Sequence, residues 1–285
     1  SFSHPRDASV GIERSYRYDA AGNLTSQIDA LRGKQDYRYD PTGRILTATG
    51  RVDEAFAFDP AGNMQTAQSG RTATMVRGNR LTVYQDLRFD YDLHGNVISR
   101  KKGAHEEAQL KWNADHQLQS AIVSRHGVLQ TTHYEYDALG RRTRKIDAFG
   151  STEYLWDGDL MIESRRGNKA ALFVFEPNSF VPLATIQDEH TYWYQCDQIG
   201  TPQELTDQAG EIVWAADYKV WGEARLRDMS LKTGTDNLSY SSSYAWQTSG
   251  KVTPVIDQPL RFQAQQFAEE TGLHYNRVRY SEPGV

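Results

Sequence analysis

Apolar and polar positions alternate along this chain in short runs, and each run ends at a turn-forming residue. The first run, YRYDAAGNL, places Tyr16 and Tyr18 on one face of an extended strand, because side chains two apart point the same way. Asp19 then predicts a turn, since its carboxylate can accept a hydrogen bond from a backbone N–H two residues on. Gly22 suits a position with positive φ, and Leu24 offers an apolar side on the return strand. The run therefore predicts a two-stranded hairpin.

The same pattern recurs at a spacing of about 20 residues, which indicates a repeat architecture. Clear copies start at Tyr37, Phe56, Phe89 and Tyr134, and weaker copies start at Leu110, Tyr154 and Phe173. One hairpin cannot bury its aromatic face alone, so neighbouring hairpins must lie side by side. We therefore expect an all-β fold, a curved or spiralling antiparallel sheet of hairpin repeats. In the copy LKWNADHQL, His116 occupies the glycine position, which predicts a longer or irregular turn.

The candidate structural residues are the paired aromatics, the turn aspartates and the turn glycines of the clearest repeats. They are Tyr16, Tyr18, Asp19, Gly22, Tyr37, Tyr39, Asp40, Gly43, Phe89, Tyr91, Asp92, Gly95, Tyr134, Tyr136, Asp137 and Gly140. Such aspartates could in principle bind calcium, but turn capping explains the same positions and we favour it.

Composition narrows the possible partners. The net charge of −5 and a pI near 5.9 argue against nucleic acid, whose binding depends on basic surfaces. The short basic runs at 100–102 and 141–145 are expected to be solvated. No apolar run is long enough to span a membrane, and the N-terminus lacks the apolar core of a signal peptide and starts as though cut from something longer. The lone Cys196 excludes an intrachain disulfide and fits a reducing compartment.

Catalytic and metal-binding motifs are not found. The histidines show no HExxH and no paired metal-ligand spacing, so we expect no metal site and no cofactor. Cys196 lies beside Asp197, but only His190 is near enough in sequence to serve as a base, so we interpret Cys196 as a turn residue. Every glycine is explained better by a turn than by a phosphate-binding loop. We expect a protein that is not an enzyme.

The repeats resemble those of the RHS/YD-repeat family, which includes toxin-complex C components and teneurins. The stretch from Tyr192 to Glu223 resembles the RHS core block, and the stretch from Leu260 to Tyr280 resembles the block that follows it. The matching positions include Asp197, Gly200, Thr201, Pro202, Asp207, Trp214, Trp221, Gly222, Gly272, Leu273, His274, Tyr275, Asn276 and Arg277.

This resemblance predicts four segments. Residues 1–190 form a YD-repeat wall, and 191–226 form the core block. Residues 227–258, rich in Ser, Thr, Gly and Asp, form an irregular insertion or loop, and 259–285 form the terminal core block. The family's self-cleaving aspartyl site has its first aspartate where this chain has Glu282, and its second would lie beyond Val285. An aspartyl dyad needs two carboxyl groups, so we expect this chain alone not to cleave itself.

The resemblance implies a segment of a β-shell that encloses a C-terminal toxin, which this chain does not contain, in competition between bacteria. The implied partners are the remaining shell segments and the toxin domain, with a secretion spike protein or chaperone as further candidates. The implied route is synthesis in the bacterial cytoplasm followed by secretion, of type VI or a related kind, into a target cell. Two alternatives stay open: a carbohydrate- or protein-binding surface built from outward aromatic rings, and an autoprotease core that needs residues beyond Val285.

Overall fold

The computed structural model describes residues 11–66, 75–78, 80–227, 256–277 and 279–283. The chain forms two compact units, Ser1–Gln85 and Asp86–Val285. Most of the predicted insertion at 227–258 lies outside the described residues. Within them every element is a strand except one short 3₁₀ turn, η1 (Phe262–Ala264), so the expectation of an all-β fold is confirmed.

The first unit contains a six-stranded sheet whose strands follow one another in sequence order, β1-β2-β3-β4-β5-β6. A hairpin of β7 and β8 follows them in the chain. The strands are β1 (Arg14–Tyr18), β2 (Leu24–Asp29), β3 (Gly33–Tyr39), β4 (Ile45–Gly50), β5 (Glu54–Phe58), β6 (Met64–Thr66), β7 (Met75–Arg77) and β8 (Arg80–Tyr84).

The second unit contains the strands from β9 to β22, again in sequence order and paired antiparallel with their neighbours, and a separate three-stranded sheet β23-β24-β25. The strands are β9 (Leu87–Tyr91), β10 (Val97–Lys102), β11 (Glu106–Trp112), β12 (Leu118–Arg125), β13 (Val128–Tyr136), β14 (Arg142–Asp147), β15 (Gly150–Asp157), β16 (Leu160–Arg166), β17 (Lys169–Phe175), β18 (Pro182–Gln187), β19 (His190–Cys196), β20 (Pro202–Thr206), β21 (Ile212–Tyr218), β22 (Ala224–Leu226), β23 (Gln266–Ala268), β24 (Leu273–Asn276) and β25 (Arg279–Ser281).

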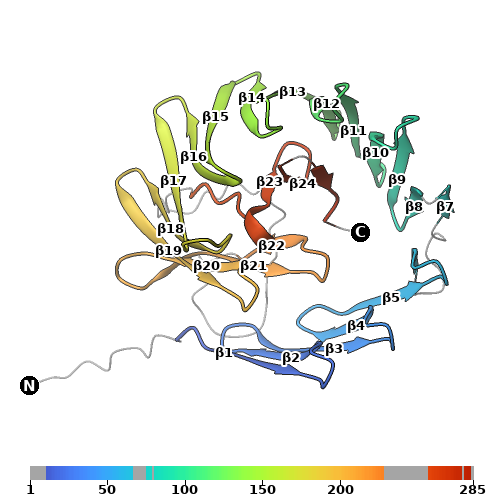
Figure 1. Ribbon diagram of the computed structural model, residues 1–285, viewed down its shortest axis with the longest axis vertical. Helices are drawn as coiled ribbons and strands as arrows, with labels where there is room; N and C mark the ends of the chain where they lie inside the picture. Colours follow the sequence, from blue (N-terminus) through green and yellow to red (C-terminus); the bar gives the residue numbers. More distant parts are fainter. Residues whose placement is uncertain (1–10, 67–74, 79, 228–255, 278, 284–285) are drawn as a thin grey trace, which may run out of the picture. The chain divides into compact units, whose positions relative to one another are not determined.

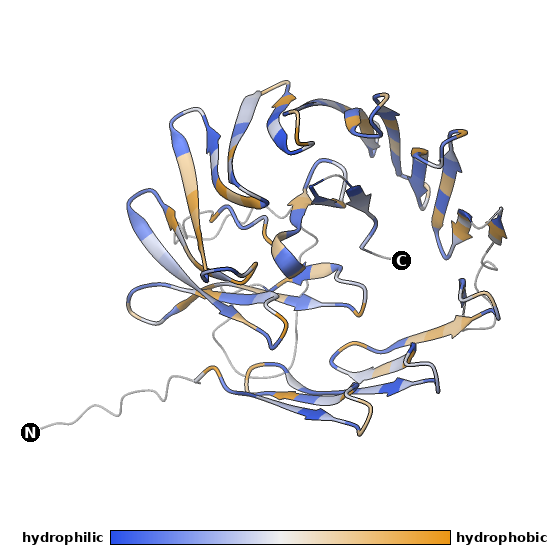
Figure 2. Ribbon diagram, in the orientation of Figure 1, coloured by the Kyte–Doolittle hydropathy of each residue, from blue (hydrophilic) through white to orange (hydrophobic). Residues whose placement is uncertain are grey.

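Strands β9 to β22 curve into an arc, and the small sheet of β23 and β24 lies on its concave side (Figure 1). Hydrophobic and hydrophilic residues alternate along many of these strands, as a sheet with one buried face requires (Figure 2). The buried face of the arc carries the repeat aromatics, among them Phe89, Tyr134, Phe173 and Tyr192. The strands of the predicted core block, β19 to β22, continue the same sheet. The prediction of one curved wall of hairpins is confirmed for this unit.

The repeat turns have the predicted geometry. In the first repeat one carboxylate oxygen of Asp19 accepts hydrogen bonds from the backbone N–H groups of Ala21 and Asn23, both at 2.9 Å. The Gly22 N–H donates to the Asp19 carbonyl at 3.1 Å, and Gly22 has a φ of +87°. The same bonds to the aspartate carboxylate recur at Asp40, Asp92, Asp137, Asp197 and Asp207. The Asn23 side-chain amide also donates to the Asp19 carboxylate at 2.9 Å, and this bond together with the backbone bonds lowers the pKa of Asp19.

The expectation of an irregular turn at His116 is wrong. His116 adopts a φ of +59°, and its N–H donates to the carbonyl of Asn113 at 3.2 Å, as the glycines do elsewhere. The side-chain oxygen of Asn113 accepts the bonds from Asp115 and Gln117 that the aspartate carboxylate accepts in other repeats. The turn is therefore strong enough to hold a histidine in the left-handed region, where a non-glycine residue is uncommon.

The second aromatic of several repeats has a polar role that the sequence pattern does not reveal. The indole N–H of Trp112 donates to the carbonyl of Val97 at 2.7 Å, and the Tyr136 hydroxyl donates to the carbonyl of Leu118 at 2.9 Å. Tyr39, Trp156 and Tyr218 make equivalent bonds to the preceding hairpin. Each such bond ties one repeat to the one before it, while the ring itself contributes apolar contact.

Replacing Gly50 by alanine tests the strand packing of the first unit. Gly50 has a φ of +133°, and an added Cβ would collide with the backbone carbonyl of Lys34. At Gly33, with a φ of +77°, an added Cβ meets nothing within 4 Å. In both Gly50→Ala and Gly33→Ala the positive φ costs roughly 1–2 kcal/mol of the free energy of unfolding. We expect Gly50→Ala to lose about 1–3 kcal/mol more than Gly33→Ala, as measured by urea unfolding, because of the collision. Equal losses of stability in the two variants would contradict the close approach of Gly50 to the Lys34 carbonyl.

Candidate functional site

The candidate site is the contact between the arc and the C-terminal block, which we define as residues 256–277 and 279–283. The block lies on the concave side of the strands, and hydrogen bonds join it to strands more than a hundred residues earlier in the chain (Figure 1). Leu273 packs in one cluster with Leu110, Leu118 and Val123 from β11 and β12. Leu260 packs in a second cluster with Phe173 and Leu205. The block therefore completes the core that the arc alone would expose to water.

A buried arginine, Arg142 at the start of β14, lies at the centre of this contact and is only 2% exposed. Its guanidinium carbon lies 4.4 Å from the ring centroid of Tyr275 and 4.8 Å from that of Tyr154. One guanidinium nitrogen donates to the side-chain oxygen of Gln266 at 3.0 Å. Its backbone N–H donates to the Tyr275 hydroxyl at 2.7 Å. The arginine thus binds the C-terminal block through its side chain and its main chain.

Glu270 provides the countercharge. Its carboxylate accepts a hydrogen bond from the Tyr134 hydroxyl at 2.6 Å and lies 3.1 Å from the ammonium group of Lys145. Burial opposes ionisation of Glu270, but Lys145, Arg142 and the Tyr134 hydroxyl together outweigh it and lower the pKa of the carboxyl. Burial opposes the charged form of Lys145, but Tyr154 and Glu270 outweigh it and raise the pKa of Lys145. The result is a buried ion pair that joins β13 and β14 to the block.

Arg100 of β10 makes a second connection and is 3% exposed. Its guanidinium donates to the Thr271 carbonyl at 3.1 Å and to Glu106 at 2.8 Å, and its Nε lies 2.5 Å from the carboxylate of Glu282. The sequence resemblance places Glu282 at the position of the first aspartate of a cleavage motif. In this chain that carboxylate forms an ion pair with the wall.

Asp257 occupies a different environment at the other end of the block. It lies next to the Ser164 hydroxyl, which donates to its carboxyl at 3.3 Å, while Gln187 accepts a bond from its N–H at 2.9 Å. Asp257 is itself among the exposed residues. The neighbouring atoms still desolvate its carboxyl group and raise its pKa, although Lys145 and Ser164 act in the opposite direction. Glu270 is therefore the buried carboxyl group of the site that favours its ionised form, whereas the pKa of the exposed Asp257 is raised.

The predicted core-motif residues divide between the wall and the block. Asp197 and Asp207 cap turns of the wall, Thr201 and Pro202 are buried, and Trp214 packs against the second cluster. Trp221 is 39% exposed, and an added Cβ at Gly222 would lie 3.8 Å from the His274 ring. In the block, Tyr275 is buried beside Arg142, and Gly272 lies close to Arg100. Gly200 lies against Val181 of the wall, where an added Cβ would come within 2.8 Å of the valine side chain.

The other motif residues of the block differ in exposure. Burial and the nearby Arg261 lower the pKa of His274 to about 3, so the ring is neutral near pH 7. Its Nδ1 lies 3.2 Å from the side-chain oxygen of Gln265. Asn276 is exposed, and Arg277, also exposed, pairs with Asp159 of the wall at 3.0 Å. Cys196 is half-buried, and its thiol donates to the Pro182 carbonyl at 3.7 Å.

The prediction that both basic runs are solvated is wrong for Arg100, Arg142 and Lys145, which face the block. The neighbouring Arg144 does point to solvent, with 42% of its side chain exposed. A one-residue register shift between Glu135 and Tyr136 lets β14 turn both Arg142 and Lys145 toward the concave side. The sequence carries no local signal for this, because the partners of these residues lie in the distant block.

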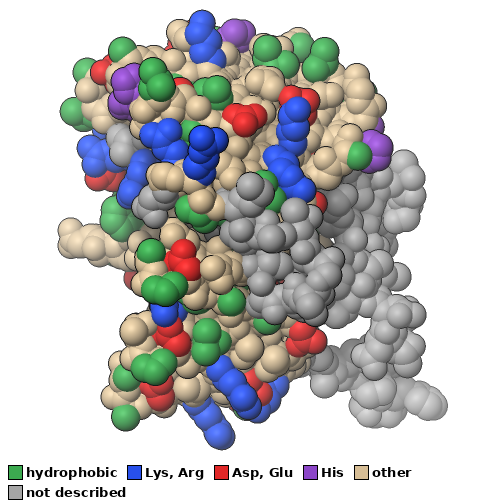
Figure 3. Space-filling view, turned by 90° about the vertical axis from the view of Figure 1, so that its right-hand side faces the viewer, with side chains coloured by type: hydrophobic (Ala, Val, Ile, Leu, Met, Phe, Trp, Pro, Cys, Tyr) green, Lys and Arg blue, Asp and Glu red, His purple; other side chains and the backbone are tan. Residues whose placement is uncertain are grey.

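Metal ligands and membrane spans are not evident in the described part of the chain. Among those residues no three or more His, Cys, Asp or Glu side chains form a group that could hold a metal ion. Nor does any helix there have the length and apolar character to cross a membrane. Lys and Arg side chains lie among Asp and Glu side chains on the face in Figure 3, without a continuous basic surface.

Sequence-ordered hairpins with paired aromatics and aspartate turns, closed by an interior C-terminal block, define a YD-repeat shell protein. A family model described as teneurin YD-shell matches residues 7–232. The chain belongs to this family.

The curated relatives include several proteins named as toxins. The chain is 31% identical over 303 residues to double-stranded DNA deaminase toxin A of Burkholderia cenocepacia, covering 95% of this chain and 20% of that protein. It is 23% identical over 342 residues to toxin protein Tse5 of Pseudomonas aeruginosa, covering 95% of this chain and 24% of the relative. The chain therefore spans about a fifth to a quarter of the length of these relatives.

Among solved structures, the crystal structure of TcdB2-TccC3-TEV aligns with 95% of this chain and 17% of its own chain, at 14% identity and a TM-score of 0.41.

The Arg142 contact predicts a large difference between two neighbouring arginines. Arg142→Met removes the ring contacts and the bond to Gln266, and we expect a loss of about 2–3 kcal/mol in the free energy of unfolding. Arg144→Met removes exposed ion pairs with Glu135 and Glu153, and we expect it to lower the free energy of unfolding by less than about 1 kcal/mol. Urea unfolding measures both, and trypsin should cut the block faster only in Arg142→Met. Similar behaviour of the two variants would contradict the assignment.

Stability should respond to pH in opposite ways at the carboxyl groups of Glu270 and Asp257. The folded pKa of Glu270 lies below its ordinary value of 4.5, so its contribution is present above that pH and is lost as the pH falls through the folded pKa. The folded pKa of Asp257 lies above its ordinary value of 3.8, so its contribution is present below that pH and is lost as the pH rises through the folded pKa.

We therefore expect Glu270→Gln to be less stable than the parent at neutral pH, with a difference that shrinks in acid. Asp257→Asn should be as stable as the parent in acid and more stable at neutral pH. Urea midpoints measured across the acid-to-neutral range test both expectations. A neutral-pH loss of stability in both variants would show that Asp257 is held as a carboxylate.

Proposed function

We propose that this chain is a wall segment of a shell that encloses a toxin segment for delivery in competition between bacteria. The observation that supports this most directly is the C-terminal block, which is held on the concave side of the wall by buried polar contacts. The concave face of the wall already holds a later segment of the same chain. This supports a role in which the wall surrounds polypeptide. The toxin names of the relatives, which extend far beyond this chain, agree with this role.

The strands of the C-terminal block lie on the concave side of the arc (Figure 1). A segment that followed would start from inside the wall, which is the direction that enclosure requires. The proposed partners are other shell segments and the enclosed toxin, with a secretion spike or chaperone as a loading partner. Synthesis in the bacterial cytoplasm and export by a type VI or related route complete the proposal.

We further propose that the chain acts without catalysis of its own. Glu282 is tied to Arg100, whose guanidinium also binds Glu106 and the Thr271 carbonyl. A self-cleaving aspartyl pair needs two carboxyl groups that share one proton. Glu282 shares the Arg100 guanidinium with Glu106, and this arrangement suits a structural ion pair.

Protease protection in the complete natural polypeptide tests the enclosure. Electron micrographs of that polypeptide should show hollow particles, and the toxin segment should resist trypsin at concentrations that digest the same segment expressed alone. A variant that weakens the wall, Arg142→Met, should make the segment sensitive, whereas Arg144→Met should not. Digestion of the toxin segment at the same rate inside and outside the parent polypeptide would refute enclosure.

A further inference from the structure

Two histidines that are 21 residues apart in sequence, His105 and His126, lie opposite each other at the end of the β11–β12 ladder. The last paired residues of that ladder are Glu106 and Arg125, so the histidines occupy the next pair of positions. The backbone N–H of His126 donates to the carbonyl of His105 at 2.9 Å. Directly opposed residues of antiparallel strands project their side chains to the same face. The two imidazoles are therefore held side by side by the main chain.

The rings have the separation of a shared metal site. Their centroids lie 5.3 Å apart with an angle of 20° between the planes. Two imidazoles that bind one tetrahedral metal through bonds of about 2.0 Å hold their centroids about 5 Å apart. A shared site requires one nitrogen of each ring to turn toward a common point between them. Both histidines are exposed, so a cation can reach them from solvent.

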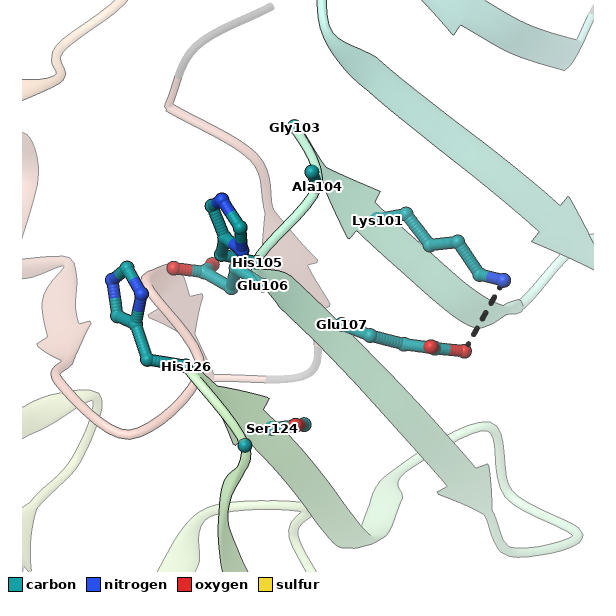
Figure 4. Close-up of a pocket in the computed structure, with 9 residues that line it drawn as sticks. Lys101, Gly103, Ala104, His105, Glu106, Glu107, Ser124 and His126 are labelled. Atoms are coloured by element: carbon teal, nitrogen blue, oxygen red, sulfur yellow. Dashed lines mark ion pairs between the residues drawn. The ribbon is translucent and has the colours of Figure 1, made fainter.

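A polar pocket of 330 Å³ surrounds the pair and is lined also by Lys101, Glu107 and Ser124 (Figure 4). Glu107 already pairs with Lys101 at 3.4 Å, and Glu106 pairs with Arg100 and Arg125. The carboxylates and the cations of the pocket therefore offset one another, and neither glutamate supplies a committed third ligand. The histidine nitrogens are the groups that distinguish this pocket from an ordinary charged surface.

We propose that His105 and His126 form a two-histidine site for a borderline divalent transition metal, Zn²⁺, Ni²⁺ or Cu²⁺, with water as the remaining ligands. Imidazole nitrogen suits these cations, whereas Ca²⁺ and Mg²⁺ prefer oxygen ligands. A bound cation would join the β10–β11 turn to the β12–β13 turn and add a cross-link between neighbouring hairpins. This would stabilise the wall by mass action, because the unfolded chain does not hold the two rings together.

A second histidine pair provides an internal control. His94 and His116 lie with their ring centroids 5.4 Å apart at an angle of 63°. The Asn96 side-chain amide donates to Nδ1 of His116 at 3.0 Å, so that nitrogen is already occupied. His116 and His126 both adopt positive φ, with values of 59° and 48°. Asparagine tolerates this conformation, so His126→Asn and His116→Asn form a matched pair of variants.

Titration of the whole chain with nickel, zinc and copper chlorides in a calorimeter tests the site. We expect binding of one cation per chain and a rise in the melting temperature on metal addition. His126→Asn and His105→Asn should each weaken metal binding by more than about tenfold and abolish the rise in melting temperature. His116→Asn should keep the parent's affinity and its rise in melting temperature.

The melting temperature of each variant without metal shows whether the variant folds. If His126→Asn fails to fold, the metal affinity of His105→Asn tests the site instead. The proposal is overturned if the parent chain binds none of the three cations. It is equally overturned if affinity survives in both His105→Asn and His126→Asn, or is lost only in His116→Asn.

Discussion

The second unit depends on one buried interaction, the contact of Arg142 and its ion-paired neighbours with the C-terminal block. A sheet of sequence-ordered hairpins needs cover for its aromatic face, and the block supplies that cover from a distant part of the chain. The guanidinium is surrounded by tyrosine rings, while Glu270 brings the opposite charge within reach of Lys145. Buried charges are costly unless they are paired and hydrogen-bonded, so the polar contacts define one position for the block where apolar packing alone would allow several.

The hairpin repeats explain how the wall reaches this arrangement. Each turn is fixed locally by an aspartate or asparagine that accepts backbone bonds, and each second aromatic with a polar group bonds back to the preceding hairpin. These contacts connect only neighbours, as in other repeat proteins. The block is the exception, because its contacts extend over strands from β10 to β20 and so link distant repeats. Local contacts build the sheet, and the block makes the curved unit cooperative.

The sequence predicts most of the repeat geometry because that geometry is local. The aspartate turns, the positive φ of Gly22 and the order of the hairpins all follow from residues within about 20 positions of each other. Two predictions failed for different reasons. The turn at His116 is a local case, because Asn113 accepts the hydrogen bonds that hold it. The burial of Arg142 depends on tertiary context, because residues of a distant segment surround it. The 21-residue separation of His105 and His126 likewise conceals their pairing, which depends on strand register. The division of the chain into four segments, 1–190, 191–226, 227–258 and 259–285, stays a prediction.

Hydrogen exchange measured along the chain tests the central claim most directly. If the block is seated on the wall, the amides of β24 should exchange as slowly as those of β12 to β14, and the Arg142 amide should be protected although it follows a turn. Glu270→Gln should then speed exchange in β24 and at Arg142 together. Fast exchange throughout β24 beside a fully protected wall would contradict the account, because the block would then be a separate segment that the wall does not hold.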